Sequence, residues 1–296
     1  MIKRTVTGII MAGVLFLVVY LTSFSHFVFD GLVLVVGAIA SYEIYSALKK
    51  SSVTVDDGEK RGYNVSLISM ILCVVGVYPL SYFFGYMGLF FNYVIAVLCA
   101  FVIFIFDQNK KINDFAVNCF ALFYPMTLLG IVFVMNNKYG MIPVLLGVGI
   151  STVSDAMAYF VGSAIGKKKI FPKISPKKTY AGFFGGILGG AIGGIIVYLI
   201  FELGGFPTHI LFTFTDLFNG TKWLAIIVYA VIGAVLAVFS EIGDLAASRV
   251  KRQLEIKDYG KILGSHGGIM DRIDSILFSI AAMGIIMEII SLSVGS

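Results

Sequence analysis

One polar stretch near the end of the chain separates two long apolar runs: residues 240–274, SEIGDLAASRVKRQLEIKDYGKILGSHGGIMDRID. Only 13% of the whole chain is charged, yet this stretch alone contains six acids and six bases. A charged side chain placed in the hydrocarbon of a bilayer costs roughly 2.5–3.5 kcal/mol on insertion scales. The stretch is therefore expected to lie at a membrane surface, with a membrane-spanning segment on each side of it.

The composition of the chain is that of a membrane protein. Hydrophobic residues make up 58% of it and the mean hydropathy is +0.95, whereas soluble domains are roughly 45–50% apolar. The apolar residues come in runs of about 20, the length that crosses a bilayer core as a helix. We therefore predict an all-α polytopic integral membrane protein with about nine transmembrane helices and no sizeable soluble domain.

The predicted spans cover most of the chain. They are 5–24, 27–48, 63–84, 87–106, 115–135, 141–165, 181–202, 222–247 and 273–292. We predict a single membrane domain over 1–296, in which 1–135 forms the N-terminal helices and 136–296 the helices that flank the polar stretch and the candidate site. Cytoplasmic loops are expected at 166–180 and 248–272.

The basic residues set the predicted orientation. Of the 22 Lys and Arg residues, all but Lys138 and Lys222 fall on the side that the nine spans assign to the N-terminus. By the positive-inside rule this side is cytoplasmic and the C-terminus is outside. The first apolar run is longer than a signal-peptide core and no A-x-A site follows it, so it is expected to be retained as a helix. The predicted location is the cell inner (cytoplasmic) membrane.

The seventh span carries a row of glycines four residues apart: Gly182, Gly186, Gly190 and Gly194. Small residues at this spacing allow two helices to approach closely in a membrane. Close helix packing is therefore the favoured interpretation, and a glycine-lined lipid groove is the alternative.

The loop after the sixth span is suited to binding phosphate. Ser175, Lys177 and Lys178 lie in PKISPKKT, residues 172–179, where prolines restrict the backbone and lysines donate to phosphate oxygens. Anchoring to anionic lipid headgroups is the alternative for the lysines. Asp155 lies inside the sixth span, and an ionisable residue at membrane depth is a functional-site hypothesis by default.

Two helix ends in the polar stretch carry paired acids. Glu241 and Asp244 share one face at the end of the eighth span, and Asp271 and Asp274 share one at the start of the ninth. Carboxylates from two helix ends suit Mg²⁺, a hard cation that takes oxygen ligands and keeps several waters. Capping of the ninth span and pairing with Arg272 is the alternative for the second pair.

A glycine turn lies between these helix ends. In His266-Gly267-Gly268 the backbone amides can approach phosphate oxygens closely, as at other anion sites that open a helix. Basic residues that could supply counter-charge are Lys251, Arg252, Lys257 and Arg272.

These residues resemble a family signature. The pattern S-x-V-K-R-x4-K-D-x-G-x2-L-G-x-H-G-G-I-x-D-R-I-D over 248–274 is similar to that of the phosphatidate cytidylyltransferases, the CDP-diacylglycerol synthases. Upstream, Ser154-Asp155, Tyr159, Gly162 and SPKKT at 175–179 resemble a second conserved region of that family. The resembling motifs occupy roughly the C-terminal half of the chain.

The resemblance implies that phosphatidic acid attacks the α-phosphorus of CTP, which gives CDP-diacylglycerol and pyrophosphate in phospholipid biosynthesis. It implies a requirement for Mg²⁺, held by Asp244, Asp271 and Asp274, and a monovalent cation such as K⁺ as an additional ion. Lys251 and Asp258 join those three acids as the expected catalytic residues. The residues expected to bind substrate are Ser175, Lys177, Lys178, Arg252, Lys257, His266, Gly267, Gly268, Arg272 and Asp155. The site is expected to face the cytoplasm, with CTP, phosphatidic acid and the bilayer as partners and no nucleic acid.

Several alternatives stay open at this point. A cation-coupled transporter would use Asp155, Glu241 and Asp244 as an ion path, but the first half contains no repeat of the polar stretch. A CDP-alcohol phosphotransferase is disfavoured because Asp30-Gly31 lacks the Ala-Arg and later aspartates of that class. For Glu43, extension of the side chain to the membrane surface is the favoured interpretation, and a role in a gate or relay is the alternative. A homodimer is one alternative for the oligomeric state.

Overall fold

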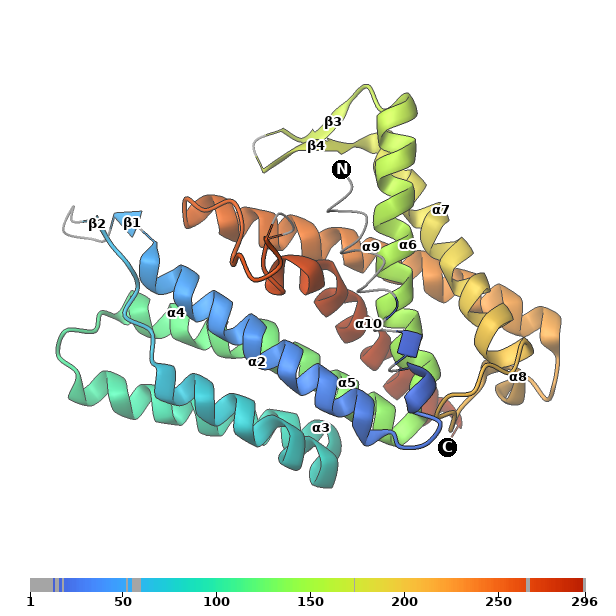
Figure 1. Cartoon of the computed structure of the whole chain (residues 1–296), viewed down its shortest axis with the longest axis horizontal. Helices are drawn as coiled ribbons and strands as arrows, with labels where there is room; N and C mark the ends of the chain where they lie inside the picture. The colour runs from blue at the N-terminus through green and yellow to red at the C-terminus, as the bar shows by residue number, and fades with distance from the viewer. Residues whose placement is uncertain are drawn as a thin grey trace. The chain divides into compact units, whose positions relative to one another are not determined.

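The computed structural model describes residues 13, 16, 17, 19–51, 53, 54, 60–172, 174–264 and 267–294. Helices dominate it (Figure 1). In chain order they are α2 (Phe27–Lys50), α3 (Leu67–Phe106), α4 (Ile112–Leu122), η1 (Phe123–Thr127), α5 (Leu128–Tyr139), α6 (Met141–Ile165), α7 (Tyr180–Val197), η2 (Tyr198–Leu203), α8 (Phe214–Leu217), α9 (Lys222–Gln253) and α10 (Met270–Val294). Two antiparallel strand pairs complete the fold: β1 (Val53–Thr54) with β2 (Lys60–Arg61), and β3 (Lys169–Phe171) with β4 (Ser175–Thr179).

The prediction of an all-α polytopic membrane protein is confirmed. Within the described ranges, seven helices are long and apolar enough to cross a membrane. One of these seven, α3, is two helices that meet at Gly85, where φ is 57° and ψ is −135°. Only glycine adopts this backbone conformation readily, so the turn predicted near residue 85 is present at that residue. The first predicted span, 5–24, lies largely outside the described residues.

The ends of the last two long helices differ from the prediction. Helix α9 continues to Gln253, past the predicted end at residue 247, and α10 begins at Met270 rather than 273. Ser248, Lys251 and Arg252 are therefore helical rather than part of a loop. A helix that emerges from the hydrocarbon loses its apolar pattern but not its backbone hydrogen bonds, so hydropathy underestimates its length.

The chain divides into two compact units. The first unit contains Met1–Phe29, Met135–Ser248 and Asp274–Ser296, and the second contains Asp30–Val134 and Arg249–Ile273. The single domain over 1–296 stays a prediction.

The first unit is built on close contacts of α7 with its neighbours. In Figure 1, α6 and α7 lie side by side and are joined by the β3–β4 hairpin. A Cβ at Gly190 or Gly194 would collide with backbone oxygens of α9 at Gly233 and Tyr229. The predicted packing of the glycine row is thus confirmed, because only a missing side chain permits these backbones to approach so closely.

The second unit packs α2, α3, α4 and α5 against one another (Figure 1). The two halves of α3 fold back on each other, and the Nδ2 amide of Asn92 donates to the Cys73 carbonyl at 3.0 Å across the hairpin. Helix α2 contacts η1 and α5, where Gly37 lies against Met126 and Leu129. A buried side-chain amide that bonds to backbone fixes the register of these apolar helices.

Candidate functional site

A cluster of charged side chains surrounds Lys178 in the first unit. Its ammonium lies 2.5 Å from Oε2 of Glu241 and 2.8 Å from Oδ2 of Asp244. Glu241 and Asp244 lie one helical turn apart on α9, so both reach the same cation. The neighbouring residue on β4, Lys177, is exposed. Two adjacent lysines that look alike in the sequence therefore have different surroundings.

The carboxylates keep Lys178 charged. Burial alone would lower the pKa of Lys178, but the charges of Asp244 and Glu241, together with their hydrogen bonds, raise it above its ordinary value. Glu241 is 2% exposed, and a buried carboxylate without a partner costs several kcal/mol. The ammonium group of Lys178 offsets that cost, so the charges of Lys178, Glu241 and Asp244 stabilise one another.

Asp155 of α6 belongs to the same cluster. Its carboxylate is repelled by Asp244 and Glu241, is attracted by Lys178, and accepts a hydrogen bond from the Ser275 hydroxyl at 3.2 Å. Space for the cluster comes from α7, because a Cβ at Gly186 would lie 3.0 Å from Oε1 of Glu241. The first unit thus brings together Asp155, Lys178 and Asp244, which the sequence predicted. Asp274 precedes Ser275 and is buried at the start of the unit's α10 segment.

A second cluster, in the second unit, is centred on Asp271. Lys251 donates to Oδ1 of Asp271 at 2.9 Å, while Oδ2 accepts the backbone N–H groups of Tyr259 at 2.9 Å and Gly268 at 3.0 Å. The Lys251 ammonium also lies 5.4 Å from the centre of the Tyr259 ring. Asp271 therefore holds the connection between α9 and α10 against the first turn of α10, where a negative charge also favours the helix dipole.

The other predicted residues of this connection have varied positions. Gly267 has a φ of +81°, and a Cβ there would meet Oδ2 of Asp271 at 3.0 Å and Asp258 at 3.4 Å. A side chain at this position would be strained by its backbone and by its neighbours. The predicted residues that are exposed are Arg252, Lys257, Asp258 and Arg272, and Ser175 is half-buried. His266 lies outside the described residues.

The donor atoms of the predicted metal ligands suit Mg²⁺ in their chemistry. Asp244, Asp271 and Asp274 offer carboxylate oxygens, the ligands that this cation prefers. Among the described residues, however, no group of three or more His, Cys, Asp or Glu side chains is close enough to hold a metal ion. Lysine ammonium groups contact Asp244 and Asp271 at 2.8 and 2.9 Å. The lysines therefore provide the counter-charge in each cluster.

The favoured interpretation of Glu43, that its side chain extends to the membrane surface, is wrong. Glu43 does not extend to the surface: it is 3% exposed, and its Oε2 accepts the backbone N–H of Met270 at 2.8 Å. An acid near the end of an apolar span is the sequence pattern of a buried functional residue, but it is equally the pattern of a residue whose side chain reaches the surface. Sequence alone cannot distinguish the two, because the deciding partner lies 227 residues away.

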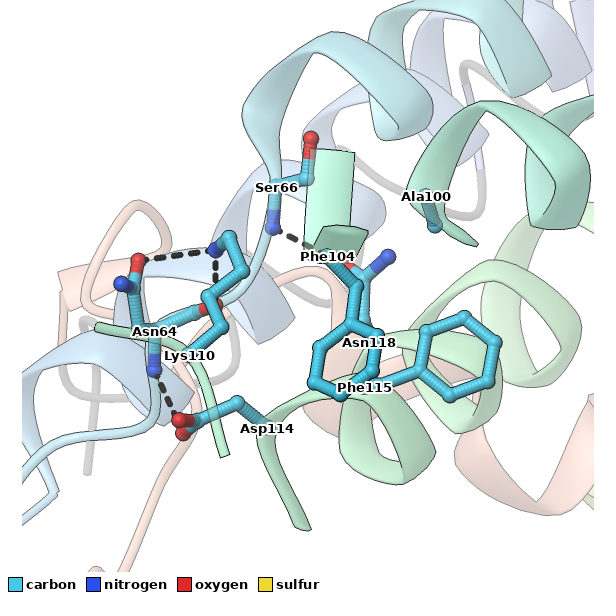
Figure 2. Close-up of a pocket in the computed structure, with 8 residues that line it drawn as sticks. All are labelled: Asn64, Ser66, Ala100, Phe104, Lys110, Asp114, Phe115 and Asn118. Carbon is cyan, nitrogen blue, oxygen red and sulfur yellow. Dashed lines mark hydrogen bonds between the residues drawn. The ribbon is translucent and has the colours of Figure 1, made fainter. Parts of the chain in front are cut away.

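A third polar cluster surrounds Asp114 at the start of α4, in a small pocket of the second unit (Figure 2). The Asp114 carboxylate accepts from the Arg61 guanidinium at 2.9 Å and from the backbone N–H of Asn64 at 2.9 Å. Lys110 donates to both the backbone and side-chain oxygens of Asn64, and burial lowers the pKa of Lys110 below its ordinary value. These groups are paired with one another, so the cluster is structural and attaches residues 61–66 to the start of α4.

We expect Asp114→Asn to lower the free energy of unfolding by about 3 kcal/mol, because a buried ion pair that loses one partner costs about that much. The Asp114 side chain is 1% exposed. The control is Asp107→Asn, whose carboxylate is 35% exposed and 3.9 Å from Lys110; a loss below about 1 kcal/mol is expected there. Denaturant unfolding in detergent micelles measures both, and equal losses would contradict the assignment.

The chain is similar to one protein family and to several individual proteins. Residues 2–290 match the profile of the Cytidylyltransferase family. A phosphatidate cytidylyltransferase of Bacillus subtilis (strain 168) is 27% identical over 289 residues, which cover 93% of each chain. The phosphatidate cytidylyltransferase of Aquifex aeolicus (strain VF5) is 28% identical over 184 residues, which cover 61% of this chain and 60% of that one. That of Staphylococcus saprophyticus is 36% identical over 135 residues, which cover 46% of this chain and 45% of that one. Since the match to the profile extends over nearly the whole chain, this protein belongs to the cytidylyltransferase family.

Proposed function

We propose that this multi-pass membrane protein transfers the CMP group of CTP to phosphatidic acid and so forms CDP-diacylglycerol and pyrophosphate. The observation that carries the proposal is the family match over residues 2–290, with a phosphatidate cytidylyltransferase as the relative that aligns over 93% of each chain. The lysine–carboxylate clusters support it, because the transferred and leaving groups are all phosphates and lysine donors suit their oxygens.

In this reaction an oxygen of the phosphatidic acid phosphate forms a new bond to the α-phosphorus of CTP. The bond from that phosphorus to the bridging oxygen of the β-phosphate breaks, and pyrophosphate leaves with the electron pair. A phosphate monoester is already largely anionic near pH 7, so no strong general base is needed. Fixed cations near the reacting phosphates stabilise the charge that develops in the transition state. We assign this role to Lys178 and Lys251, each of which a carboxylate holds in place.

We also propose that the enzyme requires Mg²⁺, with Asp244, Asp271 and Asp274 as its ligands and with K⁺ as an additional ion. A bound divalent ion supplies charge neutralisation and orientation of the phosphates. Lys178 and Lys251 are the counter-ions that stabilise Asp244 and Asp271 in the absence of a metal.

The proposed location of the reaction is the cytoplasmic face of the inner membrane. The N-terminus is cytoplasmic and the C-terminus outside in this proposal, because 20 of the 22 Lys and Arg residues then lie on the cytoplasmic side, all except Lys138 and Lys222. CTP reaches the site from the cytosol and phosphatidic acid from the inner leaflet. A homodimer is the proposed assembly.

A nucleotide panel tests the proposed function. Purified protein in detergent is given phosphatidic acid, Mg²⁺ and one of CTP, ATP, GTP or UTP, and pyrophosphate release is measured. We expect release with CTP that depends on the lipid and little release with the other three. Equal pyrophosphate release with all four nucleotides, or no release with CTP, would exclude the proposed function. Cation flux into liposomes that contain the protein, measured without CTP, would instead support a transporter.

We expect Lys177→Ala to raise the KM for CTP or phosphatidic acid about tenfold, because a charge-assisted hydrogen bond is lost. Its side chain is exposed and therefore accessible to a ligand. The control is Lys222→Ala, an exposed lysine at the start of α9. Steady-state kinetics of both variants measure the effect, and an unchanged KM would assign Lys177 to headgroup anchoring instead.

A further inference from the structure

Glu43 is a buried acid whose contacts are with the connection between α9 and α10. Helix α2 places it in the second unit with 3% of its surface exposed. Its Oε2 accepts the N–H of Met270, the first residue of α10, at 2.8 Å. The first N–H groups of a helix have no partner within the helix, so an acceptor there stabilises the helix start. Here the acceptor comes from 227 residues earlier in the chain.

Two glycines make room for this carboxylate. A Cβ built at Gly268 would overlap both carboxylate oxygens of Glu43, and a Cβ at Gly260 would overlap Oε1. Neither glycine has a positive φ, so the backbone conformation does not exclude alanine at either position. What requires glycine is the carboxylate of Glu43, which lies directly against two separate points of the connection.

The turn held by Glu43 is also held by Asp271. Gly268 donates its N–H to Oδ2 of Asp271 at 3.0 Å, and Oδ1 of Asp271 pairs with Lys251 at 2.9 Å. The negative charges of Glu43 and Asp271 repel each other. The backbone N–H groups between them offset that repulsion. The positions of Asp271 and Lys251 therefore depend on where Glu43 holds the turn.

We propose that Glu43 is a positioning residue for cytidylyl transfer: it fixes the turn at 267–270 and thereby orients Asp271 and Lys251 toward the reacting phosphates. The inference rests on the proposed function, in which these two residues act on phosphate. Glu43 acts through backbone contacts with the turn rather than through contact with substrate. A displacement of about 1 Å in a reacting group can lower a rate about 100-fold.

Kinetics of three variants test the proposal. Glu43→Ala should lower kcat about 100-fold and change the KM for CTP less than about threefold, because orientation rather than affinity is lost. Glu43→Gln retains an acceptor oxygen and should recover most of the rate. The control is Asp30→Asn, which alters another acid of α2 that is also 3% exposed and accepts from Tyr78; it should keep kcat within about twofold. A wild-type kcat in Glu43→Ala, or equal losses in Glu43→Ala and Asp30→Asn, would overturn the proposal.

A double mutant gives a second test that holds even if Glu43→Ala folds poorly. Gly268→Ala should lower kcat strongly, since the new methyl group collides with the Glu43 carboxylate. When Gly268→Ala is combined with Glu43→Asp, whose shorter side chain leaves room for the new methyl group, the loss should be smaller than the product of the two single losses because the two residues are in contact. Multiplicative losses would show that the residues act independently and would contradict the proposal.

Hydrogen exchange separates this inference from the proposed function. The amides of Tyr259, Gly268 and Met270 should exchange faster in Glu43→Ala than in wild type, and should be unchanged in Asp30→Asn. This measurement needs no substrate. An inactive wild type would therefore contradict the proposed function. Unaltered hydrogen exchange in Glu43→Ala would contradict only the positioning role of Glu43.

Discussion

The Asp271→Asn variant is expected to lose about 10²–10³-fold in the rate of CDP-diacylglycerol formation while it remains folded in the membrane. The carboxylate of Asp271 makes three interactions, with the Lys251 ammonium and with the N–H groups of Tyr259 and Gly268. An asparagine offers one oxygen and no charge, so either the lysine or the two N–H groups lose their acceptor, and in both orientations Lys251 loses the negative charge that holds it. Lys251 then has no fixed position near the phosphates.

The matched control for this variant is Glu255→Gln, an exposed acid in the same connection. It should retain nearly the full rate, because an exposed acid contributes little through screened charge. Rates are measured with labelled CTP at millimolar Mg²⁺, together with the elution volume of each variant in detergent as a check of folding. Full activity of the folded Asp271→Asn variant would contradict both the proposal that Asp271 positions Lys251 and the proposal that Asp271 is a metal ligand.

Lys178→Met should have the second large effect, a loss of about 10²-fold or more in rate and of about 3–5 kcal/mol in the free energy of unfolding. The variant keeps the length of the side chain but leaves the buried carboxylate of Glu241 without its cation. The adjacent Lys177→Met changes an exposed residue and should not alter stability measurably. Adding Glu241→Gln to Lys178→Met should restore stability but not activity, and restored activity would contradict the role of the cation.

The stability contributed by Lys178 should fall as the pH rises above about 10. Its pKa is raised above the ordinary value in the folded protein. A group whose folded pKa is raised stabilises fully below its unfolded pKa, which is 10.5 here, and loses that contribution as the pH rises through the folded pKa. Unfolding of wild type and Lys178→Met at pH 9 and above measures the difference, and a difference that does not shrink as the pH rises would contradict the pairing.

The architecture could be predicted from the sequence because hydropathy and glycine carry most of the information in a membrane helix. The apolar runs predict the long helices, Gly85 predicts the turn within α3, and the glycine row of α7 predicts close helix packing, for which the structure identifies α9 as a partner. The β3–β4 hairpin could not be predicted, because strands as short as Lys169–Phe171 have no recognisable alternation. The charged ends of α9 and α10 carry no apolar pattern, so hydropathy does not predict that the helices extend through them.

The candidate site could be predicted only where its members lie close in sequence or share a helix face. The spacing of Glu241 and Asp244 placed both on one side of α9, and the structure adds Lys178 between them. The contact of Asp155 with Ser275 joins residues 120 positions apart, and no local pattern indicates it. Glu43 is the clearest case, since its role depends on two glycines and a helix start in a distant part of the chain.

The most direct test of the central claim follows the phosphorus of CTP. Purified protein is incubated with phosphatidic acid, Mg²⁺ and CTP labelled with ³²P at either the α or the γ position, and lipid is extracted. We predict that label from the α position enters the lipid fraction as CDP-diacylglycerol and that label from the γ position leaves as pyrophosphate. Label from the γ position in the lipid, or no label in the lipid from either nucleotide, would contradict cytidylyl transfer by this protein.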